Sequence, residues 1–265
     1  MMKIVVVVTT MHQNDLSLYS KMNLQTDAII ANQCDSDLIE ISHFNQKRVY
    51  MVSTSGRGLS RNRNIALAHL PQKVDVVVFS DDDLIFNENY EQAIIDEFEK
   101  HPFAEAIKFN IHDLSDRKIS MKRITTFEKA TRKNMSSSGV CALAIKYDAL
   151  VRYNLHFNEF FGAGTNNYCG EDTIFIQEMI NKKVKLYRSP IDVAGIFQKE
   201  SSWFNGYDHR YFSVCGKVLA TCYPHFCKIL AVRSSFRFSR NKKCKLGFFE
   251  ILADYFGGIK DIKRN

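Results

Sequence analysis

The sequence predicts an α/β protein with a mostly parallel, twisted sheet flanked by helices and a C-terminal helical extension. Three observations lead to this prediction. Short apolar segments alternate with amphipathic ones over residues 3–101, as in βαβ units. The apolar segments run almost without polar interruption, which is typical of parallel strands covered on both faces. The 265 residues are 45% apolar, enough for one sizeable core.

The first half of the chain follows this alternation closely. Ser60 is a plausible N-cap for the helix that follows the glycines of "GRGLS". Apolar residues at helical spacing predict a helix over residues 89–101 and another over 16–24. Continuous apolar runs predict strands at four places: residues 3–10, 27–33, 49–55 and 74–80.

The second half is less regular. Strands are expected at 105–111 and early in 140–150, where a helix follows, and a short strand at 184–190. Residues 169–182 open with glycine and two acids and continue with helical apolar spacing. The pattern becomes aromatic and basic from Ser201. We therefore expect a main domain over 1–225, with halves of about 1–100 and 101–225, and an extension over 226–265.

Composition limits the classes of function. Seven cysteines at irregular spacing suit a reduced cytosolic chain better than a disulfide framework. No apolar stretch approaches the ~20 residues of a membrane span. The net charge of +7 is carried by the last 38 residues, which hold ten Lys and Arg against three acids. Such a basic tail suits nucleic acid or an anionic membrane face.

Polar clusters follow three of the predicted strands: Thr9 and Thr10, "STSGRG", and the triplet Asp81, Asp82 and Asp83. Ligands of open α/β sheets bind beyond the carboxyl ends of the strands. Three adjacent carboxylates after a buried strand offer oxygen ligands to Mg²⁺ or Mn²⁺, with phosphate and water completing the shell. The alternative is a solvated, Asp-rich turn.

Two further segments carry possible chemistry. In "GRGLSRNRN", amides at a helix start and the guanidinium groups of Arg61 and Arg63 suit a diphosphate, although a solvated basic helix fits equally well. In "GEDT", Glu171 and Asp172 fall at a predicted helix start, where the helix dipole stabilises carboxylates. They are either ordinary capping acids or the site of a general base that deprotonates an acceptor hydroxyl.

Taken in order, "VVTT", "GLSRNRNIAL", "FSDDD" and "GAGTNNYCGEDTIF" resemble the motifs of GT-A-type glycosyltransferases of the large inverting family 2. The resemblance covers roughly residues 3–220. "ESSWFNGYDHRYFSVCGKV" is similar to a segment of bacterial members that build surface polysaccharide such as capsule or O-antigen. The resemblance implies a GT-A fold, which is Rossmann-like, and a nucleotide-sugar donor.

The resemblance also implies roles for individual residues. Asp172 matches the catalytic base, and Glu171 beside it orients acceptor or sugar. Asp83 is the first choice as ligand of the metal, Mn²⁺ or Mg²⁺, and Asp81 is the second, with His209 as the weakest match for a third ligand. The implied nucleotide-sugar site is completed by eight residues: Thr9, Thr10, Arg61, Arg63, Asn64, Asp81, Asp82 and Trp203.

The reaction that follows is transfer of a hexose from a UDP-sugar, with a lean to UDP-galactose, to a glycan hydroxyl. The acceptor implied is polyprenol-linked, and nucleic acid is not an expected partner.

The basic C-terminal helix has an apolar face, formed by Phe248, Phe249, Leu252, Phe256 and Ile259. It either binds an anionic membrane through 233–265 or packs on the domain. The protein is then cytoplasmic or peripheral on the inner membrane face. The rival functions are a sugar-phosphate nucleotidyltransferase, a non-enzymatic protein that binds nucleic acid or membrane through its tail, and a catalytically dead lectin-like relative.

Overall fold

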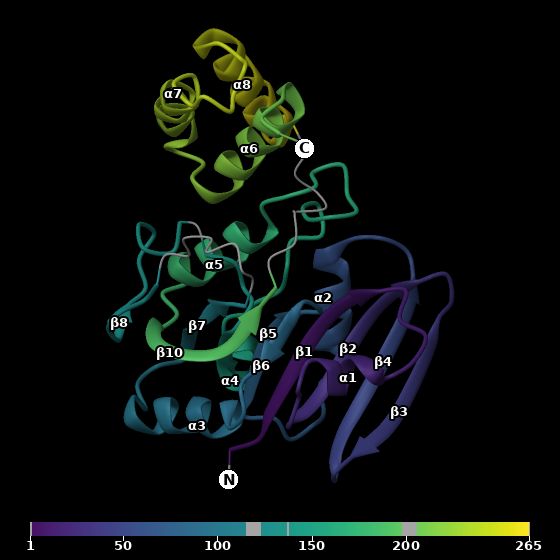
Figure 1. Cartoon of the computed structure of the whole chain (residues 1–265). Helices are drawn as coiled ribbons and strands as arrows, with labels where there is room; N and C mark the ends of the chain where they lie inside the picture. Colours follow the sequence, from purple (N-terminus) through teal and green to yellow (C-terminus); the bar gives the residue numbers. More distant parts are fainter. Residues whose placement is uncertain (1, 115–122, 137, 198–205, 265) are drawn as a thin grey trace.

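A computed structural model of the chain describes residues 2–114, 123–136, 138–197 and 206–264. Within these ranges the fold is built on one ten-stranded sheet (Figure 1). The strands lie in the order β3 (Leu38–Phe44), β4 (Lys47–Ser55), β2 (Asp27–Cys34), β1 (Ile4–Met11), β5 (Val76–Asp81), β9 (Leu143–Lys146), β7 (Ala106–Asp113), β10 (Leu186–Ile196) and β6 (Leu84–Phe86), while β8 (Glu128–Lys129) pairs with β10.

The predicted fold class is confirmed. Strands β4, β2, β1 and β5 pair in parallel, so their carboxyl ends meet at one edge of the sheet. Beyond β5 the sheet becomes mixed, because β9 runs antiparallel to both β5 and β7. Strand β3 was not predicted. It is an edge strand with exposed Leu38, Ile39 and Ile41, so its side chains lack the buried pattern that marks the other strands.

Helices cover both faces of the sheet. On one face, α1 (Ser17–Lys21) and α3 (Tyr90–Lys100) enter a core that includes Leu18, Ile94 and Phe98. On the other, a second core includes Phe79 of β5 and Phe175 of α5. The remaining helices that accompany the sheet are α2 (Leu59–Ala68), α4 (Tyr147–Arg152) and α5 (Glu171–Asn181).

Three C-terminal helices form a separate cluster: α6 (His209–Cys222), α7 (Cys227–Phe238) and α8 (Phe248–Arg264). Figure 1 shows them grouped apart from the sheet, beyond α5. Phe212 of α6 and Ile251 and Tyr255 of α8 belong to their shared core. The cluster therefore begins with α6, before the boundary expected at residue 225.

Close helix packing explains where the predicted amphipathic C-terminal helix lies. A Cβ at Gly216 would stand 2.3 Å from the Tyr255 carbonyl oxygen, so α6 and α8 need glycine where they touch. On the apolar face for which membrane binding and packing were both expected, Ile259 is buried in this helical core, whereas Phe249 and Phe256 remain exposed. None of the helices in the described ranges combines the length and apolar composition needed to cross a membrane.

Candidate active site

The ends of β1 and β5 bring the predicted threonines and aspartates together. These strands pair in parallel, with Thr9 opposite Asp81. The Thr9 hydroxyl donates to Asp81 Oδ1 at 2.8 Å, and the Thr10 hydroxyl donates to Asp82 Oδ2 at 2.5 Å. The carboxyl ends of adjacent parallel strands thus form the edge at which ligands of such sheets bind.

Arg63 of α2 joins this edge to the second predicted acid site. Its Nη2 lies 3.0 Å from Asp81 Oδ1, and its Nη1 lies 2.5 Å from Asp172 Oδ1. The Arg63 side chain is only 2% exposed, and its guanidinium stands 5.0 Å from the centre of the Phe157 ring. One planar, always charged fork therefore spans two carboxylates that are distant in sequence.

The proton affinities of this cluster follow from the bridge. Burial alone would lower the pKa of Arg63, but the carboxylates of Asp172 and Asp81 outweigh it and raise the pKa. Burial pushes the pKa of Asp81 upward, yet Arg63 and hydrogen bonds from Cys141 and Thr9 bring it below its ordinary value. Asp81 and Arg63 are thus a charged pair at neutral pH.

A buried layer beneath Asp81 was not found from the sequence. The Cys141 thiol donates to Asp81 Oδ2 at 3.1 Å, and the Lys108 ammonium donates to the Cys141 carbonyl. Burial raises the pKa of Cys141 and lowers that of Lys108. Both residues lie in or beside predicted apolar strands, where nothing in the sequence distinguishes them from packing residues.

Glu171 and Asp172 open helix α5, as predicted, after Gly170 in a left-handed conformation with φ of 100°. Asp172 Oδ2 accepts from the Val140 amide at 3.1 Å, so both of its oxygens are held. Glu171 differs, because its buried Oε2 has no hydrogen-bond partner. Burial, together with the neighbouring Asp172 charge, raises the pKa of Glu171 to about 7.

The start of α2 corrects two expectations. The helix begins at Leu59 with Gly58 as its N-cap, so Ser60 is not the cap; its hydroxyl donates to the Phe161 carbonyl at 2.7 Å. The amides of Gly58 and Leu59 also bond inside the protein, to Gln33 Oε1 at 2.8 Å and the Ala163 carbonyl at 2.9 Å. These two amides therefore fasten α2 to its neighbours and are not available to a diphosphate.

Arg61 and Asn64 make contacts within the protein. Arg61 Nη1 donates to the Ser55 carbonyl at 3.0 Å. It passes close to Gly56, where an added Cβ would lie 2.3 Å from this same nitrogen. The Asn64 amide donates to the Phe157 carbonyl at 2.9 Å and accepts from the Phe157 amide at 2.8 Å. Asn64 thus fixes the segment that carries the ring beside Arg63.

A polar group at the ends of β2 and β4 also escaped the sequence analysis. Asn32 donates to the Ser53 hydroxyl at 3.0 Å and accepts from the Gln13 amide at 3.0 Å, while Gln13 Nε2 donates to Thr10 Oγ1 at 3.1 Å. Polar residues at the end of a predicted parallel strand, as in "ANQ", are the signal that could have found Asn32.

The donor set at residues 81–83 fits a divalent cation that takes most of its ligands from diphosphate and water. Carboxylate oxygens are the ligands Mg²⁺ and Mn²⁺ prefer, and Asp82 and Asp83 are exposed at the sheet edge. The described ranges contain no group of three or more His, Cys, Asp or Glu side chains arranged to hold a metal. His209, expected as third ligand, instead pairs with Asp254 of α8 at 2.8 Å. Trp203 lies outside the described residues.

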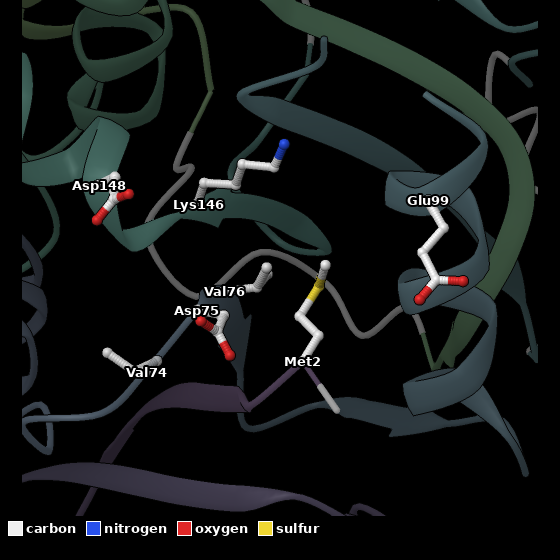
Figure 2. Close-up of a pocket in the computed structure, with 7 residues that line it drawn as sticks. All are labelled: Met2, Val74, Asp75, Val76, Glu99, Lys146 and Asp148. Atoms are coloured by element: carbon white, nitrogen blue, oxygen red, sulfur yellow. The ribbon is translucent and has the colours of Figure 1, made fainter. Parts of the chain in front are cut away.

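A pocket of about 480 Å³ lies elsewhere. It is lined by residues at the starts of β1 and β5 and by polar side chains near them, including Asp75, Lys146 and Asp148 (Figure 2). The starts of these strands are opposite the ends that carry Thr9 and Asp81. This pocket is therefore separate from the acidic edge.

The sheet with its acidic carboxyl edge is that of a GT-A-type α/β fold. Residues 25–154 match the model of the family described as glycosyl transferase family 2. The match includes Arg63 and the Asp81–Asp83 triplet but ends before Glu171 and Asp172. No curated protein matches the chain.

Solved structures support the same fold over nearly the whole chain. S. aureus TarS 1–349 in complex with UDP-GlcNAc has a TM-score of 0.67 at 14% identity, covering 98% of this chain and 80% of that one. The corresponding UDP complex has a TM-score of 0.62 at 14% identity, covering 97% and 81%. A further S. aureus TarS structure has a TM-score of 0.63 at 14% identity and covers 97% of this chain, which spans about half of that one (49%).

Proposed function

We propose that the protein is an inverting glycosyltransferase that moves a hexose from a UDP-sugar to a hydroxyl of a glycan acceptor. The observation that carries this proposal is the Arg63 bridge between Asp81 and Asp172. It joins a strand-end site suited to a nucleotide diphosphate with a helix-start carboxylate suited to deprotonating an acceptor. A transferase needs both within one site.

Asp172 is the proposed base. Arg63 and the Val140 amide hold its carboxylate in one orientation at the start of α5. It takes the proton of the acceptor hydroxyl, and the acceptor oxygen attacks the anomeric carbon from the side opposite the diphosphate. The bond to the diphosphate oxygen breaks as the new glycosidic bond forms, so one displacement inverts the anomeric centre.

Glu171 has a different proposed role. A carboxyl group with a pKa near 7 and an unpartnered, buried oxygen is partly protonated at neutral pH. In that form it donates a hydrogen bond, which suits a group that orients a sugar or acceptor hydroxyl. Glu171 thus complements Asp172, whose bridge to Arg63 is a pair of charged groups.

Charge on the departing diphosphate needs a positive partner other than Arg63, because the buried Arg63 guanidinium already pairs with Asp81 and Asp172. A divalent cation, Mn²⁺ or Mg²⁺, held by Asp83 with Asp81 or Asp82, would neutralise the diphosphate as it leaves. Thr9, Thr10 and Asn32 line the neighbouring strand ends, where the nucleoside is proposed to bind.

The proposed donor is UDP-galactose, because "GAGTNNYCGED" is similar to galactosyltransferase segments. The TarS complexes with UDP-GlcNAc and UDP support the UDP part of this proposal but not the choice of hexose. The proposed acceptor is a polyprenol-linked glycan of bacterial surface polysaccharide, reached from the cytoplasmic face of the membrane.

The deciding experiment is a donor panel. UDP-galactose, UDP-glucose, UDP-GlcNAc and a dTDP-sugar are each incubated with the protein, and nucleotide release and thermal shift are measured with Mn²⁺ and with a chelator. We expect release from UDP-galactose, faster with Mn²⁺. Asp148→Asn serves as a control: its carboxylate lines the pocket at the other end of the sheet, so this variant should release nucleotide like the unmodified protein. Binding of no nucleotide sugar contradicts the proposal, and pyrophosphate release from a nucleoside triphosphate would indicate a nucleotidyltransferase.

A further inference from the structure

Helix α7 carries an apolar stripe on its exposed side. Four large side chains recur at intervals of three or four residues, which places them along one line of the helix. Their exposed fractions range from 43% to 68%. The opposite side of α7, with Cys227 and Ala231, is buried in the helical core. We call the exposed line the α7 stripe; it consists of Phe226, Ile229, Val232 and Phe236.

The stripe lies in the most basic part of the chain. Residues 225–249 contain seven Lys and Arg and no Asp or Glu. Helical geometry places Arg233 and Arg237 along one border of the stripe and Lys228 along the other, and Arg240 follows just after the end of the helix. The Arg240 guanidinium stacks 3.8 Å from the centre of the Phe236 ring, so cation and apolar surface are contiguous.

The acids nearest in the cluster are already engaged. Asp254 of α8 pairs with His209, and Asp261 pairs with Lys217 of α6 at 3.6 Å. Glu250 Oε2 accepts from the Gly247 amide at 2.8 Å. Asp254 and Asp261 are therefore paired with side chains of α6, whereas Glu250 keeps its charge because its partner is a neutral amide. Residues 225–250 still carry seven Lys and Arg against this one acid.

We infer that the α7 stripe and its basic borders dock onto an anionic phospholipid bilayer. Apolar side chains along one line, with cations on both borders, suit a helix lying in the membrane interface: the chains enter the acyl boundary and the cations meet the headgroups. Charge complementarity favours this occupant over a second copy, because two copies would bring like charges together. The inference deepens the membrane part of the proposed function and moves the surface from α8 to α7.

The contacts of α6 explain how docking through α7 would affect the acid pair Glu171 and Asp172. Lys217 donates to Asn167 Oδ1 at 3.1 Å, and Arg210 donates to the Asn166 carbonyl at 3.3 Å. A Cβ at Gly170, beside Glu171, would meet Val218 at 2.3 Å. The helical cluster is therefore fastened to the segment that leads into the acid pair, which would hold these acids in a fixed place above the bilayer.

Vesicle co-sedimentation of the full chain tests the inference. Vesicles of phosphatidylcholine alone are compared with vesicles that also contain phosphatidylglycerol. We expect pelleting with the anionic vesicles only. Ile229→Ser with Phe236→Ser should weaken it by about tenfold for each side chain removed. Arg233→Gln with Arg237→Gln should weaken it by about fivefold for each charge.

The matched control is Leu38→Ser with Ile41→Ser, which removes equally exposed apolar side chains from β3. It should pellet like the unmodified protein. Equal pelleting of the α7 variants, or equal pelleting with neutral vesicles, overturns the inference. So does a dimer in sedimentation velocity that the α7 variants abolish. Nucleotide release from the donor is measured on every variant, so failure of the proposed function is seen separately from failure to bind vesicles.

Discussion

The acidic edge of the sheet and the α7 stripe use charge in opposite ways. At the edge, Arg63 is buried and each of its two charged contacts is a carboxylate within 3.0 Å. On α7, the arginines are exposed and no acid lies within residues 225–249. A buried charge is costly unless it is paired, so its geometry is fixed by the fold. An exposed, unopposed group of charges leaves the fold unconstrained and instead selects a partner.

This comparison predicts where substitutions act. Changes at the edge should alter catalysis and stability together, because the same ion pairs serve both. Changes on α7 should alter partner binding and little else. The four predictions below, ordered by expected size, would each break or sharpen that division.

The largest effect is expected from Asp172→Asn. The amide keeps the shape but cannot accept the acceptor's proton, so transfer should fall by about 10²- to 10⁴-fold while UDP-sugar affinity stays within a few-fold. Transfer is measured with a saturating donor, and affinity by calorimetry. Near-normal transfer by this variant would mean that Asp172 is not the base. If transfer instead falls in Glu171→Gln and not in Asp172→Asn, the base is Glu171.

Arg63→Met should cost about 3 kcal/mol in the free energy of unfolding, measured in urea. It leaves Asp81 and Asp172 without their shared cation, and breaking a buried pair by removing one partner is strongly destabilising. The matched control is Arg152→Met, whose 60% exposed side chain pairs with Glu105 and should matter by less than about 1 kcal/mol. Equal losses in the two variants would show that burial does not distinguish these ion pairs.

Much of this edge was predictable from the sequence, because short local patterns indicate where strands run and which polar residues follow them. The apolar runs located β1 and β5, and the glycine with two acids located the start of α5. What could not be predicted depends on contacts between distant segments. Nothing near Cys141 in the sequence indicates that its thiol meets Asp81. Ser60 was expected to cap α2, but Gly58 is the N-cap. The Ser60 hydroxyl instead donates to the Phe161 carbonyl, 101 residues away in the sequence.

The helical cluster was predicted less well for the same reason. Amphipathic spacing in α8 indicated an apolar face but not its neighbour, and α6 and α7 were hidden in an aromatic, basic stretch. The packing of α6 against α8 through Gly216 shows which apolar residues of α8 are covered, and the fold of the cluster leaves those of the α7 stripe exposed. The membrane hypothesis could therefore be formed from composition, whereas the residues on which it depends came from the structure.

Glu171→Gln should stabilise the protein at high pH by roughly 2–3 kcal/mol. The folded pKa of Glu171, about 7, lies above its ordinary value of 4.5. The folded state therefore binds the proton more tightly, and stability is lost as pH rises from 4.5 through 7. Unfolding free energies of the two proteins should agree near pH 4.5 and diverge up to pH 8. The exposed Glu99→Gln serves as control, and a difference independent of pH would contradict the prediction.

The smallest effect on the catalytic part is expected from the double change Ile229→Ser and Phe236→Ser. Both side chains are more than half exposed, so removing them exposes little new surface and should change unfolding free energy by less than about 0.5 kcal/mol per site. Donor hydrolysis in detergent-free buffer should stay unchanged, while transfer to an acceptor embedded in anionic vesicles falls. Denaturation in urea and both assays are made on one preparation. A large loss of stability would mean that the α7 stripe packs on the protein, and an unchanged rate on vesicles would mean that docking there does not limit access to the acceptor.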